Sequence, residues 1–551
     1  MEKLTGGQAV VKSLIKQGVE LVFGLPGVQN DWLYNAFYDY QDEIKVIHTR
    51  HEQGTAYMAL GYYLASGKVG VYSVVPGPGF LNASAALATA YGLNAKVLCL
   101  VGQIPTKTQG KGWSVLHEIN DQMGIMKSLT KWADSAKSPA DAPLKIAEAF
   151  QQLQSGRPRP VGVEVAMDVL EKQEDISNFG LLSPCKGQIS DVEQNPKSNT
   201  QNTLFEEAAR LLSAAKNPMI FVGSGAMDAG KEVLALAEAL QAPVFSYRTG
   251  KGIVSSRHYL GHTLQAGHAL WKTADVVIGI GSQVREPLLK WGHDADLKFI
   301  SLNIDESVHT KILTPSVSLT SDAAEGVSKI LEFLPKYNVT RPSREAEMLA
   351  LKAKWKSDTA YLEPQTTYLK ILREELPDDG IIVDELTQVG FATRMIWDCY
   401  QPRTYLCTGH MGTLGWGFST ALGAKVAKPN VPVVSITGDG GFMFTMQELA
   451  TAVQHRIGLV VLLFNNNAYG NVQSMQQNLY GNKVIASDLH NPDFVKMAKS
   501  FGANAVKVTS FAAFRKALKK AMGQDLPTII EIPIDKNIPS TDDFKALGKV
   551  R

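Results

Sequence analysis

Short apolar runs rich in β-branched residues alternate with segments of helical periodicity along most of this 551-residue chain. In the first third, such runs occupy 21–23, 45–48, 70–75, 96–101 and 161–165. Alternation of this kind is typical of a parallel sheet whose strands are joined by covering helices. The chain is therefore expected to be an α/β protein.

The alternation occurs in three series, separated by polar stretches. The second series has strands expected at 219–222, 275–280 and 298–303, and the third has strands expected at 433–437 and 459–464. The stretches 171–202 and 335–348 lack sustained periodicity, so we interpret them as linkers. Since a domain averages roughly 150 residues, we predict three doubly wound parallel-sheet domains, at 1–172, 200–335 and 360–551.

Charge and cysteine content limit the partners. The 55 Lys and Arg residues nearly balance the 53 Asp and Glu residues, for a net charge of +2, so no nucleic acid partner is expected. Cys99, Cys185, Cys399 and Cys407 form no CxxC pair, and so few cysteines suggest the reducing cytoplasm. No apolar run approaches the roughly 20 residues of a membrane span, and the first residues lack the apolar block of a signal peptide.

The segment 436–470 shows the pattern strand, Gly-rich turn, helix, strand, Asn-rich turn. Both turns follow parallel strands at the edge where α/β sheets bind ligands. With Gly438, Gly440 and Gly441 in the first turn, backbone N–H groups can approach phosphate oxygens closely. Asp439 adds a carboxylate, which would repel a diphosphate unless a cation lay between them. A hard ion such as Mg²⁺ accepts a carboxylate, neutral oxygens and phosphate oxygens together.

Asn466 ends the second strand of this segment and supplies an amide oxygen at the same edge. We predict that Asp439, Asn466 and the backbone carbonyl of Ala468 bind the metal. A plain crossover without a ligand is the alternative, because Thr445 and Glu448 also fit a capping box. The spacing favours the metal site: GDG precedes NN with 27 positions from the Asp to the second Asn, and this resembles the thiamine diphosphate motif.

Glu52 follows the expected strand at 45–48 and begins an Ala- and Tyr-rich helix. The C2 proton of thiamine diphosphate is removed by the cofactor's own 4′-amino group when a carboxyl group is hydrogen-bonded to N1′. Desolvation raises the pKa of such a carboxyl. A glutamate in a first helical turn is otherwise a favourable partner of the helix dipole. Because His51, Gln53 and Gly54 surround it, Glu52 resembles the family's catalytic glutamate.

Two further segments resemble the same enzymes. The turn 76–82 is similar to the Gly-Pro turn that closes over the active site beside the glutamate. The segment 409–424 is similar to the one that holds the pyrimidine, in which Gly412 presents its carbonyl to the 4′-amino group and Leu414 is the wedge that bends the cofactor.

These motifs identify the chain, by resemblance, as a member of the thiamine diphosphate enzymes of the acetolactate synthase-like group, which includes relatives such as benzoylformate decarboxylase and oxalyl-CoA decarboxylase. The resemblance covers nearly the whole chain. It implies a pyrimidine-binding domain, a central nucleotide-binding-like domain and a diphosphate- and metal-binding domain, in that order. It also implies a homodimer or a dimer of dimers, in which the glutamate of one subunit meets the diphosphate site of another.

The substrate-contacting positions depart from acetolactate synthase. His117 and Glu118 stand where those enzymes have Phe-Gln, and Met475 stands where a Trp shapes the pocket of the second 2-oxo acid. Thr387 and Gln388 replace part of a Gly-Gln-His phosphate clamp and are expected to contact the cofactor. We expect His117 and Glu118 to transfer a proton to the intermediate left by decarboxylation. A solvated polar pair on a loop is the alternative.

The predicted activity is decarboxylation of a small 2-oxo acid followed by ligation of the acyl fragment to a second carbonyl. A non-ligating 2-oxo acid decarboxylase or an acyl-CoA-type lyase of the same family is the alternative. In the central domain, Gly223, Gly225 and Asp305 loosely resemble a dinucleotide site, although Asp228 displaces the later glycine. FAD or ADP is a candidate ligand there, and a Rossmann-type dehydrogenase or nucleotide-binding regulator is the alternative of a different class.

Overall fold

The computed structural model describes residues 2–176, 179 and 196–551. The chain packs as two units, one of residues Met1–Gln188 and Thr408–Pro533 and the other of Ile189–Cys407 and Ile534–Arg551. Three six-stranded parallel sheets make up the fold, which confirms the predicted α/β class. Within the described ranges, no helix has the length and apolar character needed to cross a membrane.

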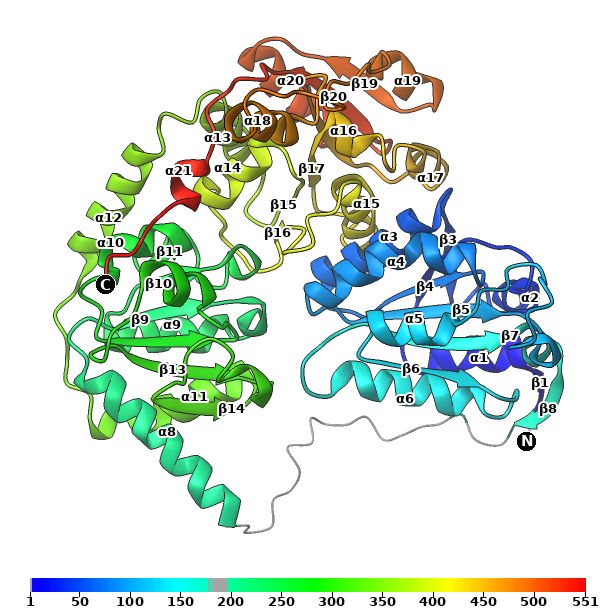
Figure 1. Ribbon diagram of the computed structural model, residues 1–551, viewed down its shortest axis with the longest axis horizontal. Helices are drawn as coiled ribbons and strands as arrows, with labels where there is room; N and C mark the ends of the chain where they lie inside the picture. The colour runs from blue at the N-terminus through cyan, green and yellow to red at the C-terminus, as the bar shows by residue number, and fades with distance from the viewer. Residues whose placement is uncertain (1, 177–178, 180–195) are drawn as a thin grey trace. The chain divides into compact units, whose positions relative to one another are not determined.

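The first sheet has the strand order β3-β2-β4-β5-β7-β6, with helices against both faces (Figure 1). Its strands are β2 (Leu21–Gly24), β3 (Lys45–His48), β4 (Gly70–Val74), β5 (Val97–Gln103), β6 (Trp132–Ala136) and β7 (Val161–Ala166). Its helices are α1 (Gly6–Lys16), α2 (Asp31–Asp39), α3 (Glu52–Ser66), α4 (Pro78–Gly92), α5 (Gln122–Leu129), α6 (Ala142–Gln154), α7 (Met167–Glu171) and the short η1 (Thr106–Thr108). The inner strands are largely apolar because both faces are covered; β4 and β7 are buried at every position.

The second sheet has the order β11-β10-β9-β12-β13-β14. Its strands are β9 (Met219–Val222), β10 (Val244–Ser246), β11 (Gly261–Thr263), β12 (Val276–Ile280), β13 (Lys298–Asn303) and β14 (Val317–Thr320). The associated helices are α8 (Pro196–Ala214), η2 (Ser224–Ala226), α9 (Gly230–Leu240), η3 (Arg248–Gly250), η4 (Leu264–Gly267), α10 (His268–Trp271), η5 (Pro287–Trp291), η6 (Glu306–Val308), α11 (Ala323–Phe333), η7 (Leu334–Lys336) and α12 (Glu345–Asp358). Phe221, Trp271 and Trp291 pack together in its core.

The third sheet has the order β16-β15-β17-β18-β20-β19. Its strands are β15 (Ile381–Asp384), β16 (Tyr405–Leu406), β17 (Val433–Gly438), β18 (Val460–Asn465), β19 (Asn504–Lys507) and β20 (Thr528–Pro533). Its helices are α13 (Gln365–Glu375), α14 (Gln388–Ile396), α15 (Trp416–Ala427), α16 (Asp439–Phe442), α17 (Glu448–Gln454), α18 (Gly470–Leu479), α19 (Phe494–Ser500) and α20 (Phe511–Ala521), and α21 (Asp542–Lys545) follows the last strand. When strands are counted along the chain within each sheet, the first and third sheets have the same order, 2-1-3-4-6-5.

Both predicted linkers are partly wrong. Within 171–202, Gln173–Ile176 form β8, which pairs antiparallel with β1 (Glu2–Thr5), because Ile176 packs against Leu4. Helix α8 begins at Pro196, and 177–178 and 180–195 lie outside the described residues. The second predicted linker, 335–348, is shorter than expected, because α12 begins at Glu345 and its residue Met348 is buried. In both places a few apolar residues anchor a segment whose overall composition is polar.

Candidate active site

The Gly-rich turn and the Asn-rich turn lie side by side at the carboxyl ends of two inner strands of the third sheet. Strands β17 and β18 pair in parallel with Gly438 opposite Phe464, so the residues that follow each strand are neighbours. Asp439 is only 2% exposed, and the backbone N–H of Asn466 donates a hydrogen bond to its carboxylate. The structure thus brings the Asp439 carboxylate to the backbone of Asn466, the two residues whose spacing carried the metal prediction.

The Asp439 carboxylate is buried among hydrogen-bond donors, and no lysine or arginine of the described residues forms an ion pair with it. Burial raises its pKa, while hydrogen bonds from Asn491, the Gly440 N–H, its own N–H and the Asn466 N–H act in the opposite direction. Within the described ranges, no lysine or arginine is among the groups that act on it. A buried carboxylate is costly without a compensating positive charge, so the site suits a cation.

Asn466 and Ala468 are tied to each other by the turn that contains them. The Ala468 N–H donates to the Asn466 side-chain oxygen at 3.2 Å, and Asn467 between them has a left-handed backbone with a φ of 53°. This turn continues into α18 through Gly470, where a Cβ would lie 2.7 Å from the Asn466 Nδ2. The geometry keeps the Asn466 amide at the sheet edge.

Sequence reasoning missed Asn491. Its Nδ2 lies 2.6 Å from an Asp439 oxygen and 3.1 and 3.2 Å from the side-chain oxygens of Asn465 and Asn467. Three oxygens therefore converge on this one nitrogen at the edge of the sheet. No motif marks Asn491, because it reaches the site from a loop far along the chain.

The donor types here fit Mg²⁺, which prefers a carboxylate and neutral oxygens and keeps positions for phosphate. This set of one carboxylate and neutral oxygens differs from a metal site built of His, Cys, Asp and Glu. In the described part of the chain, no three residues of those types are placed to hold a metal ion. Gly440 and Gly441 are buried in α16 next to Asp439. A Cβ at Gly440 would lie 2.7 Å from the Tyr469 ring, so the turn needs glycine there. The metal ligands remain a prediction.

The helix expected between the two strands is present, and one further short helix precedes it. The chain forms the four-residue α16 and then α17, which starts at Glu448. The capping-box alternative is wrong, because both side chains have tertiary or in-helix partners instead. The Thr445 hydroxyl donates to the Gly415 carbonyl at 3.2 Å, and the Glu448 carboxylate accepts from the Thr451 hydroxyl and the Arg50 N–H.

Glu52 is the first residue of α3, directly after the strand β3. The ring of His51 caps the helix by accepting from the Gln53 N–H at 3.1 Å. The Glu52 carboxylate accepts from the Asn82 side chain at 3.0 Å, and its other oxygen would lie 3.4 Å from a Cβ at Gly79. The Gly-Pro turn therefore lies beside the glutamate, as the resemblance implied.

The segment expected to hold the pyrimidine runs along the opposite end of α4. The Thr413 hydroxyl lies 3.1 Å from that of Thr89, and a Cβ at Gly92 would lie 2.7 Å from the His410 ring. Gly412 has a φ of 60°, and both it and Leu414 are half-exposed. Glu52 therefore makes its hydrogen bond at the amino end of α4, away from the segment that carries Gly412.

Thr387 and Gln388 belong to the other unit of the chain. The Thr387 hydroxyl caps α14 by accepting from the Gly390 N–H at 2.8 Å. The Gln388 side-chain oxygen is buried and has no hydrogen-bond partner among the described residues. Nearby, the buried Asp384 accepts from Arg394 and from the Tyr405 hydroxyl. Gln388 therefore has an oxygen available for a ligand, whereas the Thr387 hydroxyl already serves the helix.

His117 is held in a defined orientation on its loop. Its φ is 70°, and its Nδ1 lies 2.8 Å from the Gln29 side-chain oxygen. The Gln29 nitrogen donates to the Leu116 carbonyl, so the facing oxygen must accept and Nδ1 must carry the proton. In the neutral ring this leaves Nε2 as a proton acceptor.

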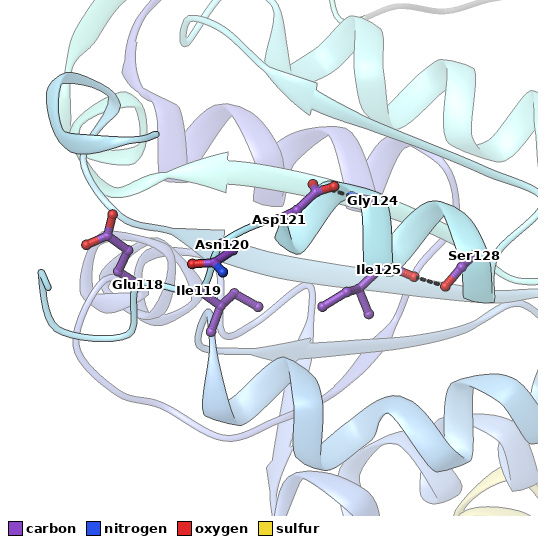
Figure 2. Close-up of a pocket in the computed structure, with 7 residues that line it drawn as sticks. All are labelled: Glu118, Ile119, Asn120, Asp121, Gly124, Ile125 and Ser128. Carbon is purple, nitrogen blue, oxygen red and sulfur yellow. Dashed lines mark hydrogen bonds between the residues drawn. The ribbon is translucent and has the colours of Figure 1, made fainter. Parts of the chain in front are cut away.

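Glu118 is engaged within the same loop. Its two oxygens accept from the backbone N–H groups of Gly112 at 3.1 Å and Val115 at 3.0 Å. It also lines an open pocket of about 750 Å³ at the start of α5, together with residues 119–121, 124, 125 and 128. Figure 2 shows its carboxylate pointing away from the hydrogen bond between Asp121 and Gly124. These contacts give Glu118 a role in shaping the loop.

The central glycines are explained by contacts inside the protein. The Gly225 N–H donates to the Gly281 carbonyl at 3.3 Å, and a Cβ at Gly223 would lie 2.6 Å from that same oxygen. Asp228 pairs with Arg403, and Asp305 caps η6. The strand order, counted as 3-2-1-4-5-6, is that of dinucleotide-binding folds, but a fold does not establish a ligand. FAD or ADP stays a prediction.

Family models match the chain in three parts. The thiamine pyrophosphate enzyme N-terminal TPP binding domain matches residues 4–125, the central domain 205–330 and the C-terminal TPP binding domain 386–532. The chain therefore belongs to the thiamine pyrophosphate enzymes, whose cofactor is the same compound as thiamine diphosphate.

Similarity to individual proteins shows which group of thiamine pyrophosphate enzymes the chain resembles. The probable acetolactate synthase large subunit of Methanocaldococcus jannaschii is 32% identical over 97% of this chain and 92% of that protein. The probable 2-ketoarginine decarboxylase of Pseudomonas aeruginosa is 32% identical over 96% of this chain and 94% of that protein. Acetolactate synthase isozyme 3 large subunit of Escherichia coli is 29% identical over 95% and 93%. The chain is thus an acetolactate synthase-like carboligase/decarboxylase that depends on thiamine diphosphate.

Proposed function

We propose that this enzyme decarboxylates a small 2-oxo acid and ligates the acyl fragment to a second carbonyl compound, with Mg²⁺ as the metal. The buried Asp439 carboxylate, which accepts from the Asn466 N–H and has no lysine or arginine partner among the described residues, is the observation that carries the cofactor site. When bound, thiamine diphosphate supplies the carbon that adds to the 2-oxo group and stabilises the charge left by loss of CO₂. Relatives named acetolactate synthase support ligation.

Different residues would hold the metal, the diphosphate and the pyrimidine of the cofactor. Asp439, Asn466 and the Ala468 carbonyl would bind the metal, and the turn with Gly440 and Gly441 at the start of α16 would lie beside the diphosphate. The pyrimidine side of the cofactor would be held and bent by Gly412 and Leu414, and Gln388 and Thr387 would supply further polar contacts.

A second copy of the chain would complete the site. The Glu52 carboxylate accepts a hydrogen bond from Asn82 near the start of α4. The Thr413 hydroxyl instead contacts that of Thr89, seven residues further along the same helix. Seven residues of α-helix span about 10 Å. Within the described residues, Asn82 is the hydrogen-bond partner of the Glu52 carboxylate, and Gly412 is not. We therefore propose a homodimer, or a dimer of dimers, in which Glu52 of one chain serves the cofactor held by the other.

His117 is the proposed proton-transfer group on the substrate side. Its Nε2 is the ring nitrogen left for a substrate after Nδ1 bonds to Gln29. Glu118 would act indirectly, because backbone N–H groups already occupy its two oxygens. When a second proton is bound at Nε2, the His117 imidazolium could donate it to the acyl fragment and return to the neutral ring; this would release an aldehyde and so compete with ligation.

Product analysis tests the proposal. The purified enzyme with thiamine diphosphate and Mg²⁺ would be given pyruvate alone, then pyruvate with a panel of 2-oxo acids and aldehydes. We expect acetohydroxy acids or 2-hydroxy ketones, with some aldehyde. Aldehyde as the sole product would instead favour a simple decarboxylase, a reading supported by the relative named 2-ketoarginine decarboxylase. Turnover of acyl-CoA substrates alone would favour the lyase.

Location in the cytoplasm is part of the same proposal. Cys99, Cys399 and Cys407 are buried and form no disulfide among the described residues, whereas Cys185 lies outside those residues. Buried cysteines without disulfides suit a reducing compartment.

A further inference from the structure

Glu448 is a buried carboxylate that faces the turn before Glu52. It is 0% exposed, and both of its oxygens lie 3.1 Å from the backbone nitrogen of Arg50. The backbone N–H of His51 also donates to it. The Thr451 hydroxyl, one turn along α17, donates at 2.6 Å. One carboxylate therefore receives the N–H groups of the two residues that precede the catalytic candidate.

The fit between α17 and this turn is close. A Cβ at Gly54 would lie 2.6 Å from a Glu448 oxygen and 2.8 Å from its carboxyl carbon, so only glycine leaves room for the carboxylate. At the other end of α17, the Arg50 guanidinium lies 3.3 Å from the Gln454 side-chain oxygen. The ring of His455, just beyond the helix, packs edge-on against His48, with centroids 5.2 Å apart. The helix thus contacts both the end of β3 and the start of α3.

The charge state of Glu448 is compatible with this acceptor role. Burial raises its pKa to about 6, while the Thr451 hydroxyl, the N–H groups of Arg50 and His51, and the positive charge of Arg50 act in the opposite direction. Above pH 6 the group is a carboxylate, which accepts at both oxygens.

We propose that Glu448 is a positioning residue that fixes the direction in which the Glu52 carboxylate leaves α3. Its contacts hold the backbone of Arg50 and His51, and Glu52 is the next residue. The inference rests on the proposed role of Glu52 toward the cofactor. If Glu448 only filled space in the core, its replacement would change the stability of the protein but not the rate of C2 proton exchange in the bound cofactor.

The test measures exchange of the C2 proton of bound thiamine diphosphate by NMR in the full-length enzyme with Mg²⁺. Glu448→Ala should slow exchange by about 10- to 100-fold, the usual effect of a misplacement of about 1 Å. Its cofactor affinity should remain close to that of the wild type. Glu448→Gln should exchange at close to the wild-type rate, since its amide oxygen can accept from Arg50 and its nitrogen can donate to Thr451. Gln454→Ala, which leaves the carboxylate in place, is the matched control and should also resemble the wild type.

A wild-type exchange rate in Glu448→Ala would overturn the proposal, as would an equally slow Glu448→Gln. If Glu448→Ala does not fold, Glu448→Asp decides, because it keeps the charge but withdraws the acceptor by one methylene. Slow exchange in the folded Asp variant supports positioning, and a wild-type rate refutes it. Glu52→Gln is measured alongside: a wild-type rate there would refute the role of Glu52 itself, which separates that failure from failure of the Glu448 proposal.

Discussion

The first and third sheets have the same strand order, yet the turns after their third strands are chemically different. After β4 the turn contains Gly77 and Gly79, which alternate with Pro76 and Pro78, and after β17 it contains Asp439 among glycines. The Gly77 N–H is already bound by the Gln122 side chain at 2.8 Å, and Gly79 packs beside Glu52. The third-sheet turn instead carries a buried carboxylate on which no lysine or arginine of the described residues acts. Equal topology therefore does not imply equal chemistry; side chains and available donors decide it.

Asp439→Ala should have the largest effect, because it removes the only charge in the third-sheet turn. We expect thiamine diphosphate affinity in the presence of Mg²⁺ to fall by more than about 100-fold, beyond the usual cost of altering groups around a metal. Titration calorimetry of apoprotein measures this. Asp488→Asn is the control, since Asp488 lies near the same edge but pairs with Gln473. Undiminished affinity in Asp439→Ala would refute the metal assignment.

Glu52→Gln tests the first-sheet side of the comparison. An amide cannot relay a proton to N1′, so C2 exchange should slow by about 10²- to 10⁴-fold, with cofactor binding largely intact. Asn82→Ala removes only the hydrogen-bond partner of Glu52 and should cost much less. Loss of cofactor binding in Glu52→Gln, rather than of exchange, would mean that Glu52 contributes to binding instead of proton relay.

His117→Phe should change the product mixture by several-fold. Phe cannot transfer a proton, so the ratio of ligated product to aldehyde should rise when pyruvate is the substrate. Glu118→Gln is the comparison: its amide oxygen keeps one of the two hydrogen bonds that the carboxylate accepts from backbone N–H groups of its own loop, so the ratio should change less than in His117→Phe. An unaltered ratio in His117→Phe removes His117 from the mechanism.

Glu448→Gln should have the smallest effect, on the pH dependence of stability. Burial raises the pKa of Glu448 from 4.5 to about 6, so the folded state binds this proton more tightly than the unfolded state does. As pH rises from 4.5 to about 6, the unfolded state ionises first and stability falls by about 2 kcal/mol. The Gln variant lacks this loss. Urea unfolding of both proteins across that window should show the variant gaining relative to wild type, and a constant difference would contradict the raised pKa.

The sequence predicted most where local patterns are strong. The strands β3, β9 and β13 have the expected bounds, because each is a mainly apolar run of four to six residues that can be recognised without tertiary information. The three-residue strands β10 and β11 were not expected, since so short a run has no measurable period. Polar segments that form elements through one or two buried residues were assigned to linkers.

The candidate site shows the same division. Asp439 and Asn466 could be paired from sequence, because parallel strands bring their ends to one edge. Asn491 and the contact of Glu448 with Arg50 could not, since each depends on how separate segments pack. For the same reason Thr445 and Glu448 resembled a capping box: the local pattern fits, but tertiary partners compete for both side chains.

Mixing two inactive variants tests most directly whether the two turns serve one cofactor from different chains. Glu52→Gln and Asp439→Ala proteins would be combined under conditions where subunits exchange, with exchange verified by native mass spectrometry. If Glu52 of one chain completes the site of the other, each mixed dimer regains one wild-type site, and an equal mixture should recover up to about a quarter of wild-type activity. A mixture that has exchanged subunits and stays inactive would contradict the shared site.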